Sequence, residues 1–241
     1  MSLSYFYTGD LRENKPELML DEDTSRHIIQ VLRMDEGENL KLTDGKGNAA
    51  EAFIITPHKK HTTVQITSFT HDDLRIPKLT IAVSLVKNAS RFEWLLEKAT
   101  ELGVAEIIPL VCERTERQKF RHDRMFGICK SAMLQSMQTW LPQLHEPVPF
   151  NEVALTAKHG QKMIAHCAMD VKVDFSSLYT PSFESHVILI GPEGDFTDEE
   201  IALARGCDFV PVSLGPTRLR TETAGIFAAA WAHGAIEDKF K

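Results

Sequence analysis

Two short apolar runs near the C-terminal end of the chain each lead into a Gly-Pro loop and then into a helical pattern. The first reads VILIGPEGDFTDEEI over residues 187–201, and the second reads FVPVSLGPTRLRTETAGI over residues 209–226. Glycine allows the main chain to approach a ligand closely, and proline fixes the turn. One such loop is an ordinary strand-to-helix turn. Two of them, separated by one helix, favour a single ligand pocket with two backbone walls.

The same loops exclude two common nucleotide sites and predict where helices begin. Neither loop contains GxGxxG or GxxxxGK(S/T), so the sequence supports neither a dinucleotide fold nor a P-loop. Thr197 and Glu200 fit a capping box before Ile201. Thr221 or Thr223 can cap the apolar run that follows the second loop.

Strand and helix patterns alternate along the chain after Pro77. The run LTIAVSLV, residues 79–86, is continuously apolar, as expected for a strand that is buried on both faces. A helical stripe over residues 89–102 ends at Gly103. Further strands are expected at residues 106–111, 162–168, 186–191 and 209–214, and further helices at 123–140, 151–159, 197–205 and 223–237. This alternation predicts an α/β domain with a mostly parallel sheet.

The first part of the chain is rich in strand patterns instead. Residues 38–44 alternate between polar and apolar side chains, and the following DGKGN is a hairpin signal. Two more strands are expected at residues 51–57 and 62–69, and one helix at 23–34 with Ile28, Val31 and Leu32 on a common face. Short strands, tight turns and one helix predict a small β-barrel.

Composition limits the classes of protein that remain. The chain has 241 residues, 43% of them hydrophobic and 25% charged, which is ordinary for one or two globular domains. Its formal net charge is −7, and both parts are net acidic, which argues against nonspecific coating of nucleic acid. A site-specific RNA enzyme with a local basic patch remains compatible with this charge.

The cysteines and histidines predict no metal site. None of the four cysteines forms a CxxC pair, and the ten histidines show no HExxH spacing. The start of the chain carries no signal-peptide pattern, so we expect a reducing cytoplasmic location. The longest apolar run, residues 224–232, is too short to span a membrane.

LIGPEGDFTDEEI and LGPTRLRTETA resemble the signatures of the bacterial family of small-subunit (16S) ribosomal RNA uridine-N3 methyltransferases (RsmE), which belongs to the SPOUT class. The resemblance extends to HIIQVLRMDEGENLKLTDGKGN, residues 27–48, and to EKATELGVAEIIPLVCERT, residues 97–115. One departure lies in AMLQSMQTWLP, residues 132–142, where Leu134, Gln138 and Trp140 replace residues that are often acidic or basic in the family. Any RNA contacts of this segment would therefore be less ionic.

The resemblance implies a fold, a domain division and an activity. Residues 1–73 would form a PUA-like β-barrel that docks RNA, and residues 74–241 an α/β SPOUT domain with a C-terminal trefoil knot that binds S-adenosylmethionine (SAM). The implied reaction is methyl transfer from SAM to N3 of a specific uridine in 16S ribosomal RNA, by a cytoplasmic homodimer that uses no metal. The alternatives are a SPOUT enzyme acting on another RNA position, such as a ribose hydroxyl, and a noncatalytic RNA-binding assembly factor.

The resemblance also assigns the residues of the cofactor site. Backbone groups of glycine loops suit the uncharged adenine and ribose, and the family motifs place SAM against the residues Leu189, Gly191, Gly194, Ser213, Leu214, Gly215 and Leu219. For the three leucines, packing in the core is the alternative role, and the two roles are compatible.

Candidates for catalysis follow the second loop. Arg220 lies in the LRTETA motif and could stabilise the anion formed when uridine loses its N3 proton. Glu222, or Glu193 in the first loop, could act as the base if burial raised its pKa. Their alternatives are a carboxylate at a helix N-terminus and a carboxylate in a turn, and proton loss to water remains open.

RNA contacts are expected on both parts of the chain. Arg218 could reach phosphate or the uracil oxygens, and its alternative is a surface arginine paired with Glu222. Arg26, His27 and Arg33 surround the helix of the first part, and the seven-residue spacing of the two arginines places them on one helical face. This face is either an RNA-docking edge or a solvated surface.

Overall fold

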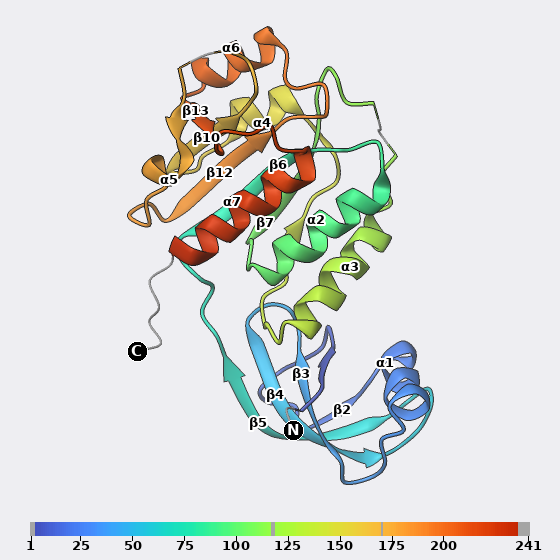
Figure 1. Cartoon of the computed structure of the whole chain (residues 1–241). Coiled ribbons are helices and arrows are strands. Elements are labelled where there is room, and N and C mark those ends of the chain that lie inside the picture. Colours follow the sequence, from blue (N-terminus) through green and yellow to red (C-terminus); the bar gives the residue numbers. More distant parts are fainter. Residues whose placement is uncertain (1–2, 117–118, 170, 236–241) are drawn as a thin grey trace. The chain divides into compact units, whose positions relative to one another are not determined.

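The computed structural model describes residues 3–116, 119–169 and 171–235 (Figure 1). The chain forms two compact units. The first comprises Met1–Leu74 together with Lys130–Leu141, and the second comprises Arg75–Cys129 together with Pro142–Lys241. Among the described residues, no helix is long and apolar enough to cross a membrane.

A five-stranded sheet in the order β1-β3-β4-β5-β2 forms the first unit. Its strands are β1 (Tyr5–Tyr7), β2 (Glu17–Met19), β3 (Asn39–Thr43), β4 (Asn48–Thr56) and β5 (Thr63–His71). The β3–β4 hairpin turns on the predicted DGKGN, where the Asp44 carboxylate accepts hydrogen bonds from the backbone amides of Lys46 and Asn48. Gly45 and Gly47 adopt φ values of 70° and 89° there, which favour glycine. The β-rich prediction is confirmed, although two strands were not expected: β1, which pairs parallel with β3, and β2, which pairs antiparallel with β5.

The single helix predicted at residues 23–34 is two shorter elements. Helix α1 (Glu22–Arg26) runs into the π-helix η1 (His27–Val31), and Arg33 then adopts a φ of 57°. A π-turn changes the rotation per residue, so the predicted apolar face does not persist. Ile28 is fully buried, whereas Val31 and Leu32 are 64% and 43% exposed. The same change invalidates the inference that Arg26 and Arg33 share one helical face.

Residues 130–141 return to the first unit, which the sequence did not indicate. Helix α3 (His122–Gln135) ends before the predicted residue 140, and Met137 adopts a φ of 54°. The indole of Trp140 donates a hydrogen bond of 2.8 Å to the Asp72 carbonyl. A Cβ on Gly47 would lie 2.7 Å from the Trp140 ring. Trp140, one of the departures from the family pattern, therefore packs on the barrel.

The second unit contains an eight-stranded sheet in the order β11-β13-β10-β12-β6-β7-β8, with β9 also paired to β7. Every pairing in it is parallel, as predicted. Its strands are β6 (Lys78–Ser84), β7 (Glu106–Val111), β8 (Gln143–Leu144), β9 (Val148–Pro149), β10 (Gln161–Ala165), β11 (Val173–Asp174), β12 (Ser185–Ile190) and β13 (Val210–Ser213). Its further helices are α2 (Ala89–Glu101), α4 (Phe150–Thr156), α5 (Phe175–Leu178), α6 (Asp198–Gly206) and α7 (Thr221–Ala235).

Helices cover both faces of this sheet. Because side chains alternate along a strand, Val187 and Leu189 of β12 pack into a core with α4 and α6. Ile190 lies on the opposite side, where a Cβ on Gly225 of α7 would be 3.8 Å from it. Helices α2 and α7 lie together in front of the sheet in Figure 1. The second unit is therefore a three-layer α/β/α sandwich, which confirms the predicted α/β class with a parallel sheet.

Two predicted helix starts can be compared directly with the structure. Helix α6 begins with the expected capping box, in which Thr197 and Glu200 bond each other's backbone amides. Helix α7 begins at Thr221, so Thr221 and Thr223 lie inside the helix and not at the predicted cap position, and the Thr221 hydroxyl bonds Gly191 instead. Residues 236 and 237 of the predicted extent lie outside the described part of the chain. The trefoil knot that the resemblance implies stays a prediction.

Candidate functional site

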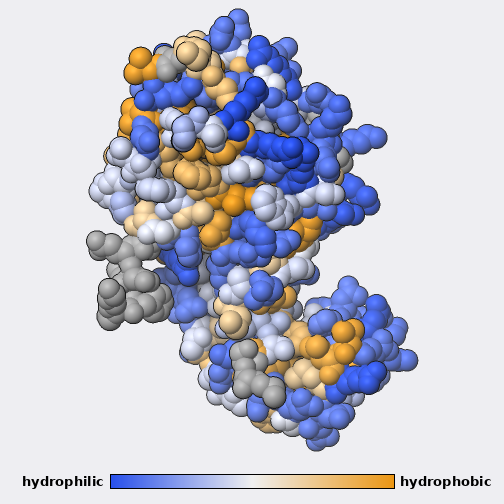
Figure 2. Space-filling view, in the orientation of Figure 1, coloured by the Kyte–Doolittle hydropathy of each residue, from blue (hydrophilic) through white to orange (hydrophobic). Residues whose placement is uncertain are grey.

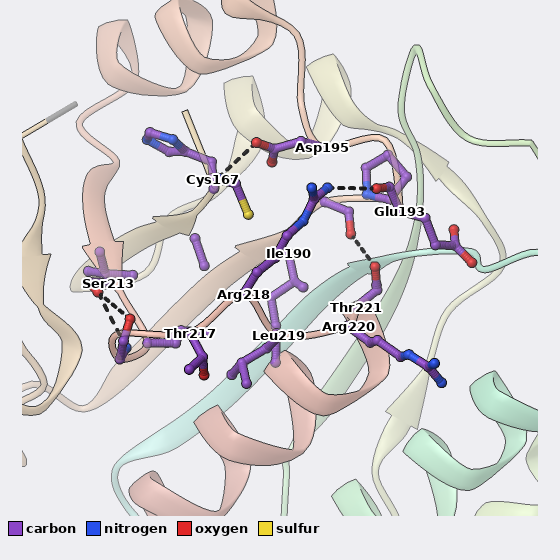
Figure 3. Close-up of a pocket in the computed structure, with 18 of the residues that line it drawn as sticks. Cys167, Ile190, Glu193, Asp195, Ser213, Thr217, Arg218, Leu219, Arg220 and Thr221 are labelled. Carbon is purple, nitrogen blue, oxygen red and sulfur yellow. Dashed lines mark hydrogen bonds between the residues drawn. The ribbon is translucent and has the colours of Figure 1, made fainter. Parts of the chain in front are cut away.

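Three neighbouring parallel strands end around one cavity in the second unit. Strands β13, β10 and β12 are adjacent in the sheet, and the residues that follow them line a pocket of about 440 Å³ (Figure 3). The two Gly-Pro loops form two of its walls, as the sequence predicted. The third wall comes from Ala165, the last residue of β10, and from His166 and Cys167, which follow it. A crevice at the carboxyl ends of parallel strands is the usual ligand site of open α/β sheets.

The first loop, residues 191–197, is held by groups from other strand ends. The backbone amide of Lys87, after β6, donates to the Glu193 carboxylate at 3.2 Å. The amide of Cys167 donates to the Asp195 carboxylate at 2.8 Å. Asp195 itself adopts a φ of 66°, which is uncommon for a residue with a side chain. These contacts fix the loop from segments that are distant in sequence.

The backbone conformation of the second loop depends on Gly215. This residue adopts a φ of 121°, and a Cβ built on it would have no neighbour within 4 Å. Glycine is therefore required here by the backbone conformation and not by lack of space. The Ser213 hydroxyl bridges the turn, because it accepts from the Gly215 amide and donates to the Gly215 carbonyl.

Two side chains from the second loop and α7 reach back to the first loop, as the dashed lines in Figure 3 show. Arg218 donates from its guanidinium to the Glu193 carbonyl at 3.1 Å. The Thr221 hydroxyl donates to the buried Gly191 carbonyl at 2.8 Å. The two walls predicted from sequence are thus directly joined.

The structure brings five of the seven predicted cofactor residues to the cavity. They are Gly191, Ser213, Leu214, Gly215 and Leu219. Leu189 does not line the cavity, because its side chain is fully buried in the core with α4 and α6. Gly194 does not line it either, and a Cβ there would lie 3.3 Å from the Arg114 side chain.

The two predicted catalytic residues are placed differently. Arg220 lies on the cavity rim, is exposed, and makes no side-chain hydrogen bond or ion pair within the described ranges. Figure 3 shows its side chain extending away from Arg218. Glu222 is not among the lining residues and is 4% exposed. One of its carboxylate oxygens lies 3.6 Å from Nε of Arg91, and the other is buried without a hydrogen-bond partner.

The candidate RNA residues outside Arg218 lie in the first unit. Arg26 is paired with Glu22 at 2.7 Å and Asp23 at 3.6 Å, so two carboxylates already compensate its charge. His27 is exposed, and its ring makes an edge-to-face contact with Phe6. Arg33 is exposed at its positive φ.

Several lining residues were not identified from the sequence. They include Ile190, Lys172, Asp195, Thr217 and Thr221. His166 was weighed as a core or rim residue, and it is a buried part of the cavity wall. The sequence feature that could have identified this wall is the predicted strand KMIAHCA, because the carboxyl ends of parallel strands meet at the same edge of a sheet. The order of strands, which periodicity does not reveal, was the missing information.

The cavity wall combines apolar side chains with a few charged groups. Ile190, Val212, Leu214 and Leu219 offer an apolar surface, while Glu193, Asp195 and Lys172 contribute charge. Among the described residues, no group of histidine, cysteine, aspartate or glutamate side chains could hold a metal ion. The arrangement suits an organic ligand with a flat apolar part and polar ends.

Family models match both parts of the chain. The model described as an RNA methyltransferase domain matches residues 73–233, and the one described as an RNA methyltransferase PUA domain matches residues 20–67.

Individual relatives cover almost the whole chain. It is 30% identical over 218 residues to the ribosomal RNA small subunit methyltransferase E of Synechocystis, covering 88% of this chain and 71% of that protein. It is similar to the crystal structure of a probable rRNA-methyltransferase from Porphyromonas gingivalis, with a TM-score of 0.89, 35% identity, and coverage of 97% and 98% of the two chains. A Neisseria gonorrhoeae ribosomal RNA small subunit methyltransferase E bound to S-adenosyl methionine gives a TM-score of 0.85 at 28% identity, covering 95% and 96%.

Proposed function

The chain belongs to the RNA methyltransferase family, and from that premise we propose that it transfers a methyl group from SAM to N3 of a specific uridine in 16S ribosomal RNA. The observation that carries the proposal is the cavity where both Gly-Pro loops meet. The Neisseria relative, whose structure is described as bound to S-adenosyl methionine, supports the choice of ligand.

The residues of the cavity fit SAM. The volume of the cavity, about 440 Å³, suits a ligand of the size of SAM. Ile190, Leu214 and Leu219 would contact the adenine ring, and the backbone of Gly191 and Gly215 can approach closely. When bound, SAM supplies an electrophilic methyl group on a sulfonium. The work of the protein is to hold this group in line with the uracil ring and to exclude water.

Arg220 is the residue that we assign to the chemical step. The N3–H of uridine is weakly acidic, and loss of this proton spreads negative charge over N3 and the two carbonyl oxygens of uracil. The Arg220 guanidinium, which has no competing partner among the described residues, can donate to such an anion from the cavity rim. Glu222 lies behind the wall beside Arg91, so we assign it to holding Arg91 rather than to removing the proton. The proton can then leave to water.

We assign RNA docking to the first unit and to Arg218. The match to a PUA domain model supports the first part of this proposal. Arg33 and His27 are the better candidates there, because Arg26 is already paired with acidic side chains. The relatives named for the small ribosomal subunit support that particle, in the cytoplasm, as the place of action.

We also propose a homodimer. Phe227 and Trp231 on α7 are 38% and 41% exposed, and their rings stack with centroids 6.4 Å apart. Figure 2 shows apolar side chains gathered on the face of the second unit that carries α7. Light scattering should give twice the chain mass of 27.2 kDa. A monomer with full activity would refute this proposal.

The decisive experiment maps the modified nucleoside. Small subunits from a strain lacking this protein should accept one methyl group from labelled SAM, and digestion should yield 3-methyluridine. A methylated ribose would instead support the alternative SPOUT activity. Failure to bind SAM in calorimetry would favour the noncatalytic assembly factor.

A further inference from the structure

Arg114 follows β7, yet its side chain reaches the first loop of the cavity, 80 residues along the chain. Its Nη1 donates to the Gly194 carbonyl at 2.9 Å and to the Phe196 carbonyl at 3.3 Å. These are charge-assisted bonds, which are stronger than bonds between neutral groups. One guanidinium therefore holds two carbonyls of the loop, those of Gly194 and Phe196, close together.

Neighbouring residues hold the Arg114 segment in place. The backbone amide of Glu113 donates to the Glu200 carboxylate at 2.9 Å, and the same carboxylate accepts from the Thr197 amide at the start of α6. The Thr115 hydroxyl accepts from the Cys112 amide and bonds the Ser84 hydroxyl at 2.8 Å. Arg114 thus extends from a segment that is fixed at both ends.

Gly194 lies directly under the aliphatic part of Arg114. A Cβ on Gly194 would lie 3.3 Å from Cβ and 3.4 Å from Cδ of Arg114, which is tighter than an ordinary contact. The φ of Gly194 lies outside the left-handed region, so its backbone does not require glycine. The residue does not line the cavity. Space for Arg114 is the remaining reason for glycine at this position.

We propose that Arg114 is a positioning residue that fixes the conformation of the SAM-facing loop, and that Gly194 is glycine to admit the Arg114 side chain and not to admit the ligand. The inference rests on the proposed binding of SAM. It differs from the assignment that the family resemblance implies, in which Gly194 contacts SAM itself. Arg114 touches no reacting atom and acts through the neighbours of Gly194 in the loop, Gly191, Pro192, Glu193 and Asp195, which do line the cavity.

The test is a double-mutant cycle read out by calorimetric SAM affinity. The variants are Arg114→Ala, Gly194→Ala and the double variant, with Arg124→Ala as a control for loss of an arginine that lies outside the cavity wall and pairs with Glu93. Arg114→Ala should weaken SAM binding about tenfold, as expected for loss of a charged hydrogen-bond donor. Gly194→Ala should also weaken binding in the native background, but should add little once Arg114 is absent. If Gly194→Ala weakens SAM binding equally in both backgrounds, the glycine serves the ligand and the proposal is wrong.

A second variant covers the case in which Arg114→Ala does not fold. Arg114→Lys keeps the charge and most of the stem, and should melt close to the native protein while losing part of the SAM affinity, because its ammonium ends one bond short of the position of Nη1, which bonds both carbonyls. At saturating SAM, its single-turnover rate should approach the native rate, since only positioning of the loop is affected. Native SAM affinity in Arg114→Lys and in a folded Arg114→Ala would refute the positioning role. If the native protein itself bound no SAM, the proposed function would fail instead.

Discussion

The Thr221 hydroxyl donates a 2.8 Å hydrogen bond to the Gly191 carbonyl, joining the first residue of α7 to the loop after β12. Both residues are buried, so water cannot replace the bond. This contact connects the entry of the last helix with the wall of the cavity.

Thr221→Ala should therefore lower both stability and SAM affinity. Loss of the donor leaves a buried carbonyl unpaired, which costs about 1–3 kcal/mol in the free energy of unfolding. Urea denaturation and calorimetry with SAM measure the two effects. Thr221→Ser keeps the hydroxyl and is the matched control. Equal stability of the alanine and serine variants would contradict this role of the bond.

Gly215→Val should weaken SAM binding at least tenfold, about 1.4 kcal/mol at 25 °C. Because the Cβ site is empty and φ is 121°, the cause is backbone strain, and Gly215→Ala should produce most of the effect. Gly206→Ala is the control, since Gly206 has neither a positive φ nor a neighbour to meet a Cβ. Unchanged affinity in a folded Gly215→Val variant would remove this turn from the SAM site.

Arg220→Ala should lower the rate of methyl transfer by on the order of a hundredfold, as for loss of other preorganised donors to a developing anion. SAM affinity and melting temperature should change little, because the side chain is exposed and unpaired within the described ranges. Arg220→Lys should recover only part of the rate. Single-turnover methylation of small subunits, with Arg124→Ala as the control, gives the comparison. A near-native rate would exclude Arg220 from the mechanism.

Acid should destabilise the second unit through a cluster of histidines around Glu106. His159, whose Nε2 lies 3.8 Å from the Glu106 carboxylate, and hydrogen bonds from Thr80 and His145 lower the pKa of Glu106 from 4.5 to about 2. Burial, followed by the nearby His159, lowers the pKa of His186 from 6.5 to about 4. The unfolded chain therefore takes up a proton at His186 as the pH falls from 6.5 to about 4, and another at Glu106 from 4.5 to about 2. The free energy of unfolding should fall through both windows.

The melting temperature as a function of pH tests this expectation. His186→Gln removes one of the titrating groups, so the melting temperature should depend less on pH between 6.5 and 4. The exposed His58 offers a control variant, His58→Gln. An unchanged slope for His186→Gln would show that another group causes the loss of stability.

Local signals in the sequence were sufficient where the structure depends on neighbours along the chain. The capping box of Thr197 and Glu200, the DGKGN hairpin and the end of α2 at Gly103 each involve residues within a few positions of one another. The two Gly-Pro loops were identified for the same reason. The family motifs added the expectation that the loops share a ligand.

Contacts between distant segments could not be predicted in this way. Gly194 and Gly215 look alike in the sequence, yet only at Gly194 would a Cβ meet a distant side chain, that of Arg114, 80 residues earlier. Glu222 has the residue type of a base, but only the packing against Arg91 shows that it lies behind the cavity wall. The third cavity wall could not be predicted, because it depends on the order of strands in the sheet. The π-helix η1 could not be predicted either, because the spacing of apolar residues does not distinguish it from an α-helix.

Because residues 130–141 belong to the first unit, residues 1–74 alone are not a complete domain that could be moved into another protein. A gene fragment that stops after residue 74 would omit Trp140, and would leave the surface of Gly47 and the Asp72 carbonyl without their partner. Recombination at this single boundary would not carry a complete barrel into another protein. Each unit is encoded in two separate stretches of the same gene, so a single exchange of gene segments cannot separate the two units.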